Sequence, residues 1–258
     1  MLKKKYFIKT LPDSLTKGLP TIHPAWSEVP LIKVPYTDKY EVNPTDAACM
    51  ALMGDEKALD WLLDNQDRET GVYWHWYNDV YYGIAKPWCS GLTQALAASA
   101  LIRHGYKKEA NMAMWGLYDN SYFDGYVTEK PGVIVINAWI YALFAMQDMC
   151  DAGEFYQWML EPTLNKIKAF FKSGKALTKN GWSRYDQTGI PATLFYHGIV
   201  KEQIEALDNM YLSDTFGLTL EKMIGAKYPK LTRLAYVTKK RHIYSLPTYI
   251  RRRKWLKK

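Results

Sequence analysis

The stretch that decides the fold is CSGLTQALAASALIRHGY, residues 89–106. It has the composition of a helix in which small side chains predominate: Ser90, Gly91, Ala95, Ala97, Ala98, Ser99 and Ala100. Small side chains allow neighbouring helices to approach closely, because the side chains at the contact set the distance between helix axes. The segment is therefore expected to be an inner helix with other helices around it.

Helical patterns continue on both sides of this segment. Residues 44–66 form two helices in sequence, with Pro44 in a first-turn position and Gly54-Asp55 as a stop and restart. Further helices are expected at about 89–104, 107–118, 136–150, 153–172, 195–210 and 213–225. The eight helices pair naturally as four antiparallel hairpins. Aromatic segments of strand-like or turn-like character lie between them, at residues 71–83, 121–135 and 178–189.

This arrangement predicts a mainly all-α protein. The expected architecture is an α/α toroid, an incomplete α/α barrel of about four helical hairpins, with short β-hairpins in the loops. The loops would collect at one end and build the site. A helical bundle with long loops is the alternative. Residues 1–43, with five prolines, are expected to be an extended N-terminal arm, residues 44–225 the toroid, and residues 226–258 a basic C-terminal tail.

The formal charge of +8 comes from the tail. Residues 226–258 hold twelve Lys and Arg and no acid, so the remainder carries a net charge of −4. The tail could be a solvated end, an anchor for an anionic polymer, or a segment that contacts an anionic membrane surface, which we favour. Nucleic acid remains an option for the tail alone and is not expected for the globular part.

The cysteines and the apolar segments bear on the compartment. Cys49, Cys89 and Cys150 are too few and too scattered for a disulfide framework, which favours a reducing environment. The sequence has no secretory signal pattern and no apolar run long enough to span a membrane. A cytoplasmic location, peripheral to the cytoplasmic membrane, is expected.

The sequence lacks the motifs that several kinds of chemistry require. The five histidines are dispersed without ligand spacing, so no metal site is expected. There is no Gly-rich phosphate loop, so no nucleotide cofactor is expected. Cys89-Ser90 has no partner histidine or nucleophile elbow. Twenty tyrosines and ten tryptophans are compatible with either an aromatic-rich core or a carbohydrate cleft.

Two short stretches carry candidate acid–base groups. GWSRYDQTG, residues 181–189, presents Tyr185 beside Arg184 and Asp186 in an expected hairpin. LFYHGIVKEQIEAL, residues 194–207, begins a helix with Tyr196 and His197. A tyrosine near a helix N-terminus or a cation has its ionised form favoured, so it could shuttle a proton. A purely structural role at the helix start is the alternative for Tyr196.

Taken in order, these motifs resemble those of the D-glucuronyl C5-epimerases. PWCSGLTQALAASALIRHGY, residues 87–106, is similar to that family's pattern of tryptophan, serine, glutamine, small residues and Leu-x-Arg. VIVINAWIYALFAMQDM, residues 133–149, is similar to its next helix, with Ala138 where the family has glycine. GWSRYDQ and LFYHGIVKEQIEAL resemble its Tyr-Asp turn and its Tyr-His helix. The resemblance covers roughly residues 40–225.

The resemblance implies the α/α toroid and an isomerase without a cofactor. Such an enzyme converts D-glucuronic acid to L-iduronic acid residues within a heparan sulfate-like polysaccharide, by removing and returning the proton at C5. Its partner would be an anionic uronic-acid polysaccharide. The alternatives are a uronic-acid polysaccharide lyase, and a non-catalytic glycan-binding or scaffold relative in polysaccharide biosynthesis.

The resemblance also assigns roles to residues. It makes Tyr185 and Tyr196 catalytic. In place of the family's glutamate–tyrosine pair this chain reads FDGYVTEKPG, residues 123–132, so Tyr126 stands for the tyrosine, and the carboxylate is Glu129, Asp124 or neither of them. Tyr196 and either Glu129 or Tyr126 are expected on opposite faces of the sugar. The residues expected to bind the substrate are Trp76, Tyr81, Tyr82, Trp88, Gln94, Arg103, Asn137, Arg184 and His197, with Lys86 as a further cation.

Overall fold

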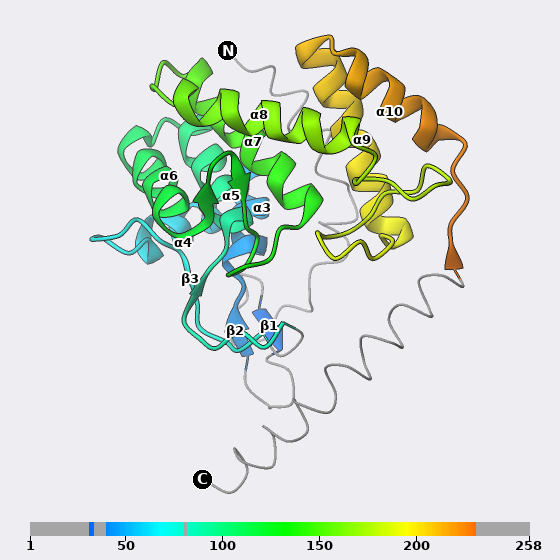
Figure 1. Cartoon of the computed structure of the whole chain (residues 1–258). Coiled ribbons are helices and arrows are strands. Elements are labelled where there is room, and N and C mark those ends of the chain that lie inside the picture. Colours follow the sequence, from blue (N-terminus) through cyan, green and yellow to red (C-terminus); the bar gives the residue numbers. More distant parts are fainter. Residues whose placement is uncertain (1–30, 34–39, 80–81, 231–258) are drawn as a thin grey trace, which may run out of the picture.

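The computed structural model describes residues 31–33, 40–79 and 82–230, and this part of the chain is mainly helical, as the sequence predicts (Figure 1). Its eight helices are α3 (Pro44–Leu52), α4 (Glu56–Asn65), α5 (Gly91–Arg103), α6 (Lys107–Ser121), α7 (Ile136–Asp151), α8 (Gln157–Lys172), α9 (Leu194–Tyr211) and α10 (Asp214–Ile224). The expected location of a helix in each of these places is confirmed.

Short antiparallel strand pairs make up the β-structure of the described residues. β1 (Leu31–Lys33) pairs with β2 (Tyr40–Val42), β3 (Trp74–His75) with β4 (Trp88–Cys89), and β5 (Tyr122–Phe123) with β6 (Tyr126–Val127). The β1–β2 pair lies within the segment expected to be an extended arm. The rest of that arm, residues 1–30 and 34–39, and the tail beyond residue 230 lie outside the described residues.

Side-chain caps explain where several helices begin. Asn43 Oδ1 accepts a hydrogen bond from the Thr45 N–H (3.2 Å), and Pro44 occupies the first turn of α3. Asp55 and Ser90 cap α4 and α5 in the same way, at 2.9 and 3.3 Å. Each cap satisfies a backbone donor that the helix itself leaves without a partner.

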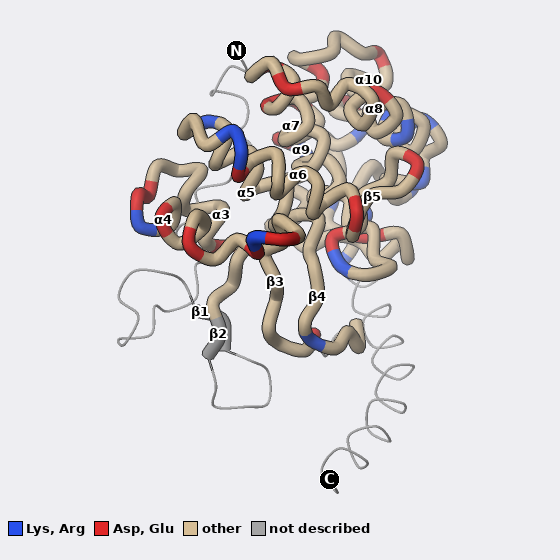
Figure 2. Tube along the Cα trace, turned by 90° about the vertical axis from the view of Figure 1, so that its left-hand side faces the viewer, with Lys and Arg blue, Asp and Glu red and all other residues tan. Residues whose placement is uncertain are grey.

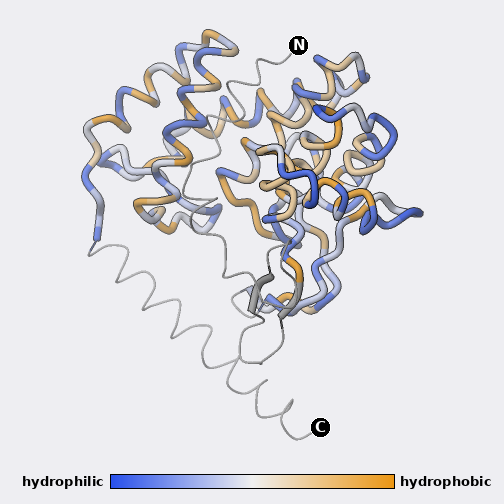
Figure 3. Tube along the Cα trace, turned by 180° about the vertical axis from the view of Figure 1, so that it is seen from behind, coloured by the Kyte–Doolittle hydropathy of each residue, from blue (hydrophilic) through white to orange (hydrophobic). Residues whose placement is uncertain are grey.

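The helices pack in two rows. α3, α5, α7 and α9 form an inner row in which each helix contacts the next, and α4, α6, α8 and α10 each pack against the helix before them. Nearly every residue of α5 and α7 is buried, as expected for inner helices. In Figure 3, hydrophobic and hydrophilic residues alternate along the outermost helices, a pattern typical of helices that bury one face. None of the helices in the described part combines the length and the apolar character needed to cross a membrane.

Candidate functional site

A cavity of about 310 Å³ lies at the N-terminal ends of the four inner helices. This volume is at the lower end of the range for small-molecule sites, roughly 300–1,000 Å³. We call the cavity the tyrosine–carboxylate pocket. Its lining residues are Asn43, Thr45, Asp46, Cys49, His75, Tyr77, Trp88, Ser90, Leu92, Leu96, Glu129, Lys130, Asn137, Tyr141, Phe195, Tyr196 and Ile199.

The four helix ends each contribute a partial positive charge to the pocket. α3, α5, α7 and α9 all contribute residues of their first two turns to the lining. The N-terminus of a helix carries roughly half a positive charge, so it favours an anion by about 0.3–1 kcal/mol when exposed. The start of α7 has no side-chain cap. The convergence of these ends favours a negatively charged ligand, or negative charge that develops during a reaction.

Three groups that can transfer protons line the pocket from separate elements. Tyr196 comes from the first turn of α9, Glu129 from the loop between β6 and α7, and Asp46 from the first turn of α3. Burial raises the pKa of the Tyr196 phenol, and the charge of Glu129 adds to this effect. Burial also raises the pKa of Glu129, and it raises the pKa of Asp46 to about 6 against the opposing hydrogen bond from Asn43.

Lys130 supplies a cation beside these acids. Its Nζ lies 2.6 Å from Asp79 Oδ2 and 3.7 Å from Glu129 Oε1. Burial opposes the charge on Lys130, but the neighbouring carboxylates, Glu129 first, outweigh burial and raise the pKa of its ammonium group. The same Nζ stands 4.9 Å from the ring centre of Tyr82 and 5.7 Å from that of Trp88, distances at which cation–π attraction contributes. Lys130 is therefore charged at neutral pH and fixed in position.

Tyr185 lies directly behind Tyr196. The two ring centres are 4.7 Å apart, so the two phenol side chains are in contact. Burial strongly raises the pKa of Tyr185, so this phenol stays protonated. Its proximity opposes the rise that burial causes in the pKa of Tyr196. The Tyr185 carbonyl accepts from the Ile136 N–H at the start of α7 (3.0 Å), which fixes this loop against an inner helix.

One wall of the pocket is a set of packed aromatic rings. His75 stacks on Trp88 with ring centres 4.0 Å apart. The two nitrogens of His75 form hydrogen bonds with Thr93 Oγ1 (2.9 Å) and the Tyr77 hydroxyl (3.1 Å). Burial lowers the pKa of His75 to about 3, with the nearby Lys130 contributing, so the ring is neutral at pH 7. This wall is shaped for packing and hydrogen bonding rather than for proton transfer.

Asn137 places a buried hydrogen-bond acceptor in the pocket. Its Oδ1 is buried and has no hydrogen-bond donor among the described residues, and the residue lines the pocket. A buried acceptor without a donor costs about 1–3 kcal/mol. A sugar hydroxyl in the pocket would supply that donor.

The structure brings some of the expected site residues together. Tyr196, Glu129, Trp88 and Asn137 line one pocket, although up to 108 positions separate their places in the sequence. Two more stand next to it. Tyr185 contacts Tyr196, and Tyr82 lies under Lys130 with its hydroxyl 3.3 Å from Asp186 Oδ2.

Other expected site residues do not line this pocket. Tyr126 stacks on Trp139 (5.1 Å between ring centres), so it does not face Tyr196 as one hypothesis required. Of the two carboxylates considered for that motif, Asp124 pairs instead with Lys166 on the surface (2.7 Å). Tyr81 lies outside the described residues.

The two arginines are committed to structural partners elsewhere. Arg103 binds both oxygens of Asp148, at 2.8 and 2.9 Å. Arg184 donates from Nε to the Leu177 carbonyl at 3.1 Å. The side chain of the third expected cation, Lys86, is exposed. The structure thus places Lys130, rather than any of these three, as the cation of the pocket.

The remaining three expected binding residues lie outside the tyrosine–carboxylate pocket. His197 stacks on Trp182 (3.7 Å between ring centres) and forms a hydrogen bond with Ser183. Gln94 is fully buried, with its Nε2 3.5 Å from Cys89 Sγ. Trp76 lies on the other side of β3 from the pocket, in a second cavity.

Sequence reasoning missed Asp46 and Lys130. Asp46 follows Asn43-Pro44 in a first helical turn, where an acid is ordinary, so its sequence gave no functional signal. Lys130 directly follows Glu129, and the sequence singled it out only as one letter of the motif FDGYVTEKPG, residues 123–132. In the part of the chain that the structure describes, no three His, Cys, Asp or Glu side chains are grouped closely enough to hold a metal ion.

Comparison of the chain with protein-family models gives no match, and comparison with curated proteins gives none either. The function is therefore inferred from the chemistry of the pocket together with the motifs that it contains.

Proposed function

We propose that the protein is a cofactor-free C5-epimerase that converts D-glucuronic acid residues of a polysaccharide into L-iduronic acid residues. The observation that carries the proposal is that Tyr196 and Glu129, assigned to proton transfer by separate motifs, line one pocket together with the cation Lys130. The four helix N-termini around the pocket suit an anionic sugar.

The reaction needs a base on one face of the sugar and an acid on the other. The C5–H bond lies α to the carboxylate, so its electron pair moves into the carboxylate group when a base removes the proton. Glu129 is the carboxylate base, and the Tyr196 phenol, kept protonated by its raised pKa, returns a proton to C5 from the opposite face. In the reverse direction the two groups exchange roles.

The charge that develops on the substrate carboxylate requires stabilisation. Lys130 and the N-terminal ends of the inner helices supply fixed positive charge, which needs no rearrangement during the reaction. The protonated phenol of Tyr185 lies beside Tyr196 and stabilises Tyr196 after it has given up its proton. Tyr82 and Trp88, whose ring centres lie 4.9 and 5.7 Å from Lys130 Nζ, hold this cation in place beside the substrate.

The proposal includes the finer architecture. An inner row of four successive helices, each backed by an outer helix, supports an α/α toroid open between α3 and α9 rather than a simple bundle. The concentration of the lining residues at the helix starts and in the loops between hairpins agrees with this arrangement.

The test is proton exchange at C5. The purified protein is incubated in heavy water with a polymer of glucuronic acid and N-acetylglucosamine, and NMR follows deuterium at C5. Deuterium together with an L-iduronic acid signal supports the proposal. Deuterium together with an ultraviolet-absorbing double bond identifies a lyase instead. Binding without exchange on any uronic-acid polymer identifies a non-catalytic glycan-binding relative.

A variant pair makes the test specific to the pocket. Tyr196→Phe removes only the phenolic oxygen and is expected to lower exchange by about 10²-fold or more, the usual contribution of a positioned acid or base. Tyr106→Phe removes the same atom from an exposed tyrosine before α6 and serves as the control. Equal exchange in both variants would remove Tyr196 from the catalytic groups.

The location remains part of the proposal. We assign the protein to the cytoplasm, with the basic residues 226–258 in contact with an anionic membrane surface. Removal of residues 239–258 is expected to abolish co-sedimentation with vesicles that contain anionic lipid. Unchanged partitioning would exclude the tail as an anchor.

A further inference from the structure

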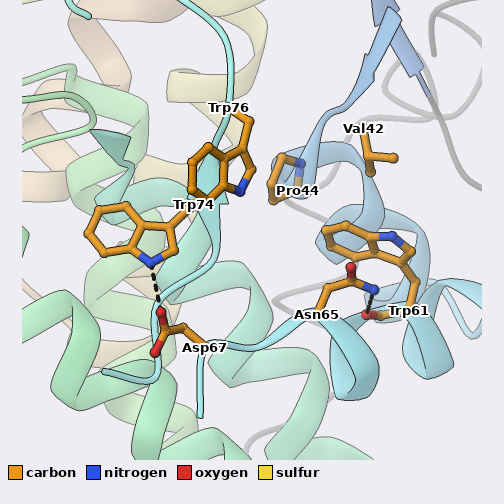
Figure 4. Close-up of a pocket in the computed structure, with 7 residues that line it drawn as sticks. All are labelled: Val42, Pro44, Trp61, Asn65, Asp67, Trp74 and Trp76. Carbon is orange, nitrogen blue, oxygen red and sulfur yellow. Dashed lines mark hydrogen bonds between the residues drawn. The ribbon is translucent and has the colours of Figure 1, made fainter. Parts of the chain in front are cut away.

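A second cavity of about 530 Å³ lies on the other side of β3 from the tyrosine–carboxylate pocket. We call it the tryptophan groove. Its lining residues are Val42, Pro44, Trp61, Asn65, Asp67, Trp74 and Trp76 (Figure 4). Side chains point alternately to opposite sides along β3 and the two residues after it, so Trp74 and Trp76 line this groove while His75 and Tyr77 line the pocket.

The groove combines aromatic faces with fixed polar groups. Figure 4 shows Trp61, Trp74 and Trp76 arranged around one hollow, with Asn65 and Asp67 at its edge. Trp76 is 56% exposed, unusually high for so large an apolar side chain. Aromatic walls with a few well-placed polar groups are typical of small-molecule sites, and flat indole faces suit the C–H faces of sugar rings.

The polar groups of the groove are held in place and retain bonding capacity. Asp67 Oδ2 accepts from Trp74 Nε1 (3.1 Å), and its Oδ1 accepts from the backbone N–H groups of Glu69 (3.0 Å) and Thr70 (2.9 Å). These hydrogen bonds fix the orientation of the carboxylate at the edge of the groove. Asn65 donates from Nδ2 to the Trp61 carbonyl (2.9 Å). Among the residues drawn in Figure 4, its amide oxygen forms no hydrogen bond and can accept one from a ligand.

The charge of the groove selects the kind of sugar. The hydrogen bonds from Thr70 and Trp74 lower the pKa of Asp67, so this carboxylate is ionised at neutral pH. Asp60, Asp64 and Glu69 stand in the same segment, residues 60–69, against the single cation Arg68. Figure 2 shows acidic residues on and beside α4. An anionic uronic acid would be repelled here, whereas a neutral sugar would not.

We infer that the tryptophan groove binds a neutral sugar residue, a hexose or N-acetylhexosamine, of a glycan chain. The inference rests on the proposed function in one respect. It takes this neutral sugar to belong to the same polysaccharide whose uronic acid enters the tyrosine–carboxylate pocket. The two cavities would then divide the polymer by charge, with the uronic acid at the helix N-termini and its neutral neighbours against the tryptophans.

The test measures binding without turnover. N,N′-diacetylchitobiose, a neutral disaccharide, is titrated into the full chain while tryptophan fluorescence and heat are recorded, and methyl β-D-glucuronide is the anionic comparison. Saturable binding of the disaccharide is expected, with about tenfold weaker affinity in Trp61→Ala and in Trp76→Ala. Trp115→Ala is the control, because Trp115 is comparably exposed (51%) but lies on α6.

Each other outcome overturns the inference. No saturable binding, or equal weakening by Trp115→Ala, would exclude the groove as a sugar site. Glucuronide binding that equals disaccharide binding, and that Trp76→Ala weakens, would exclude selection by charge. Self-association that Trp76→Ala abolishes, without sugar binding, would identify the groove as a contact between copies of the chain. Proton exchange at C5 is measured separately, so failure of the proposed reaction leaves a positive binding result standing.

Discussion

Replacement of Asp46 by asparagine is expected to stabilise the protein at neutral pH and to change its stability little at about pH 4. Burial raises the pKa of Asp46 from 3.8 to about 6 in the folded protein. The folded state therefore holds this proton more tightly than the unfolded state does. As the pH rises from 3.8 through 6 the unfolded chain ionises first, so stability falls over that window and the full penalty applies above it.

The magnitude follows from the size of the shift. One pKa unit corresponds to about 1.4 kcal/mol, so ionised Asp46 costs the folded protein about 3 kcal/mol at pH 7 and less than about 1 kcal/mol at pH 4. Asparagine is never ionised, and its amide oxygen can still accept the hydrogen bond that Asn43 Nδ2 now donates to Asp46 Oδ2 at 2.7 Å. The variant should regain most of the penalty at pH 7.

Urea unfolding followed by far-ultraviolet circular dichroism measures the effect at both pH values. Asp60→Asn, which removes an exposed acid from α4, controls for the change in overall charge and should alter stability by less than about 0.5 kcal/mol. An Asp46→Asn variant that is equally stabilised at both pH values, or not stabilised at pH 7, would refute the reasoning from burial. A stabilised variant with reduced proton exchange would show that the carboxylate is kept for function.

Two further substitutions test the packing around α5. Arg103→Ala leaves the buried Asp148 without its cation and should lower the free energy of urea unfolding by about 3–5 kcal/mol. The control Lys107→Ala, in an exposed ion pair at 3.3 Å, should lower it by less than about 1 kcal/mol. If the two variants are equally stable and Arg103→Ala binds the polymer more weakly, Arg103 belongs to the substrate site. Gly91→Ala places a Cβ 2.4 Å from a backbone oxygen of the loop after β6 and should lower the thermal midpoint of unfolding. Gly198→Ala in α9 places its Cβ in open space and should raise the free energy of unfolding by up to about 1 kcal/mol. A loss of stability in Gly198→Ala would contradict the reasoning.

The positions of the helices were predictable because their signals are local. Apolar spacing and capping residues lie within the segment that they organise, and both ends of α5 and α7 fall within two residues of the expected bounds. The start of α8 was not predicted correctly. It was expected at residue 153, but Gly153 has a φ of +85° and the Glu154 N–H bonds back to the Met149 carbonyl, so a turn at residues 152–153 and an irregular segment at residues 154–156 precede the helix.

The site was predictable only in part, because a motif does not show which end of a helix faces the ligand. Ser90 at the start of α5 lines the pocket, whereas Arg103 ends the same 13-residue helix, about 20 Å away at 1.5 Å per residue. The motif had joined the two as one signature. In the β5–β6 hairpin the motif likewise joined Tyr126 and Glu129, but Tyr126 packs on Trp139 and only Glu129 reaches the pocket.

Under the proposed function, an anionic sugar must enter a pocket that already holds Glu129 and Asp46, with Lys130 shared between Glu129 and Asp79. Side-chain charge alone would exclude the ligand. The positive ends of four helices offset part of this charge, and a carboxyl group whose pKa is already about 6 offsets more by taking up a proton when a second anion approaches. Asp46 is then neutral in the complex, while the Lys130 ammonium, 3.7 Å from Glu129, opposes the effect of burial on the pKa of Glu129 and favours its ionised form as the base. The burial that makes ionised Asp46 unfavourable in the empty pocket thus allows the pocket to accept an anion. Asp46 and Glu129 take different roles because Lys130 contacts only Glu129 of the two.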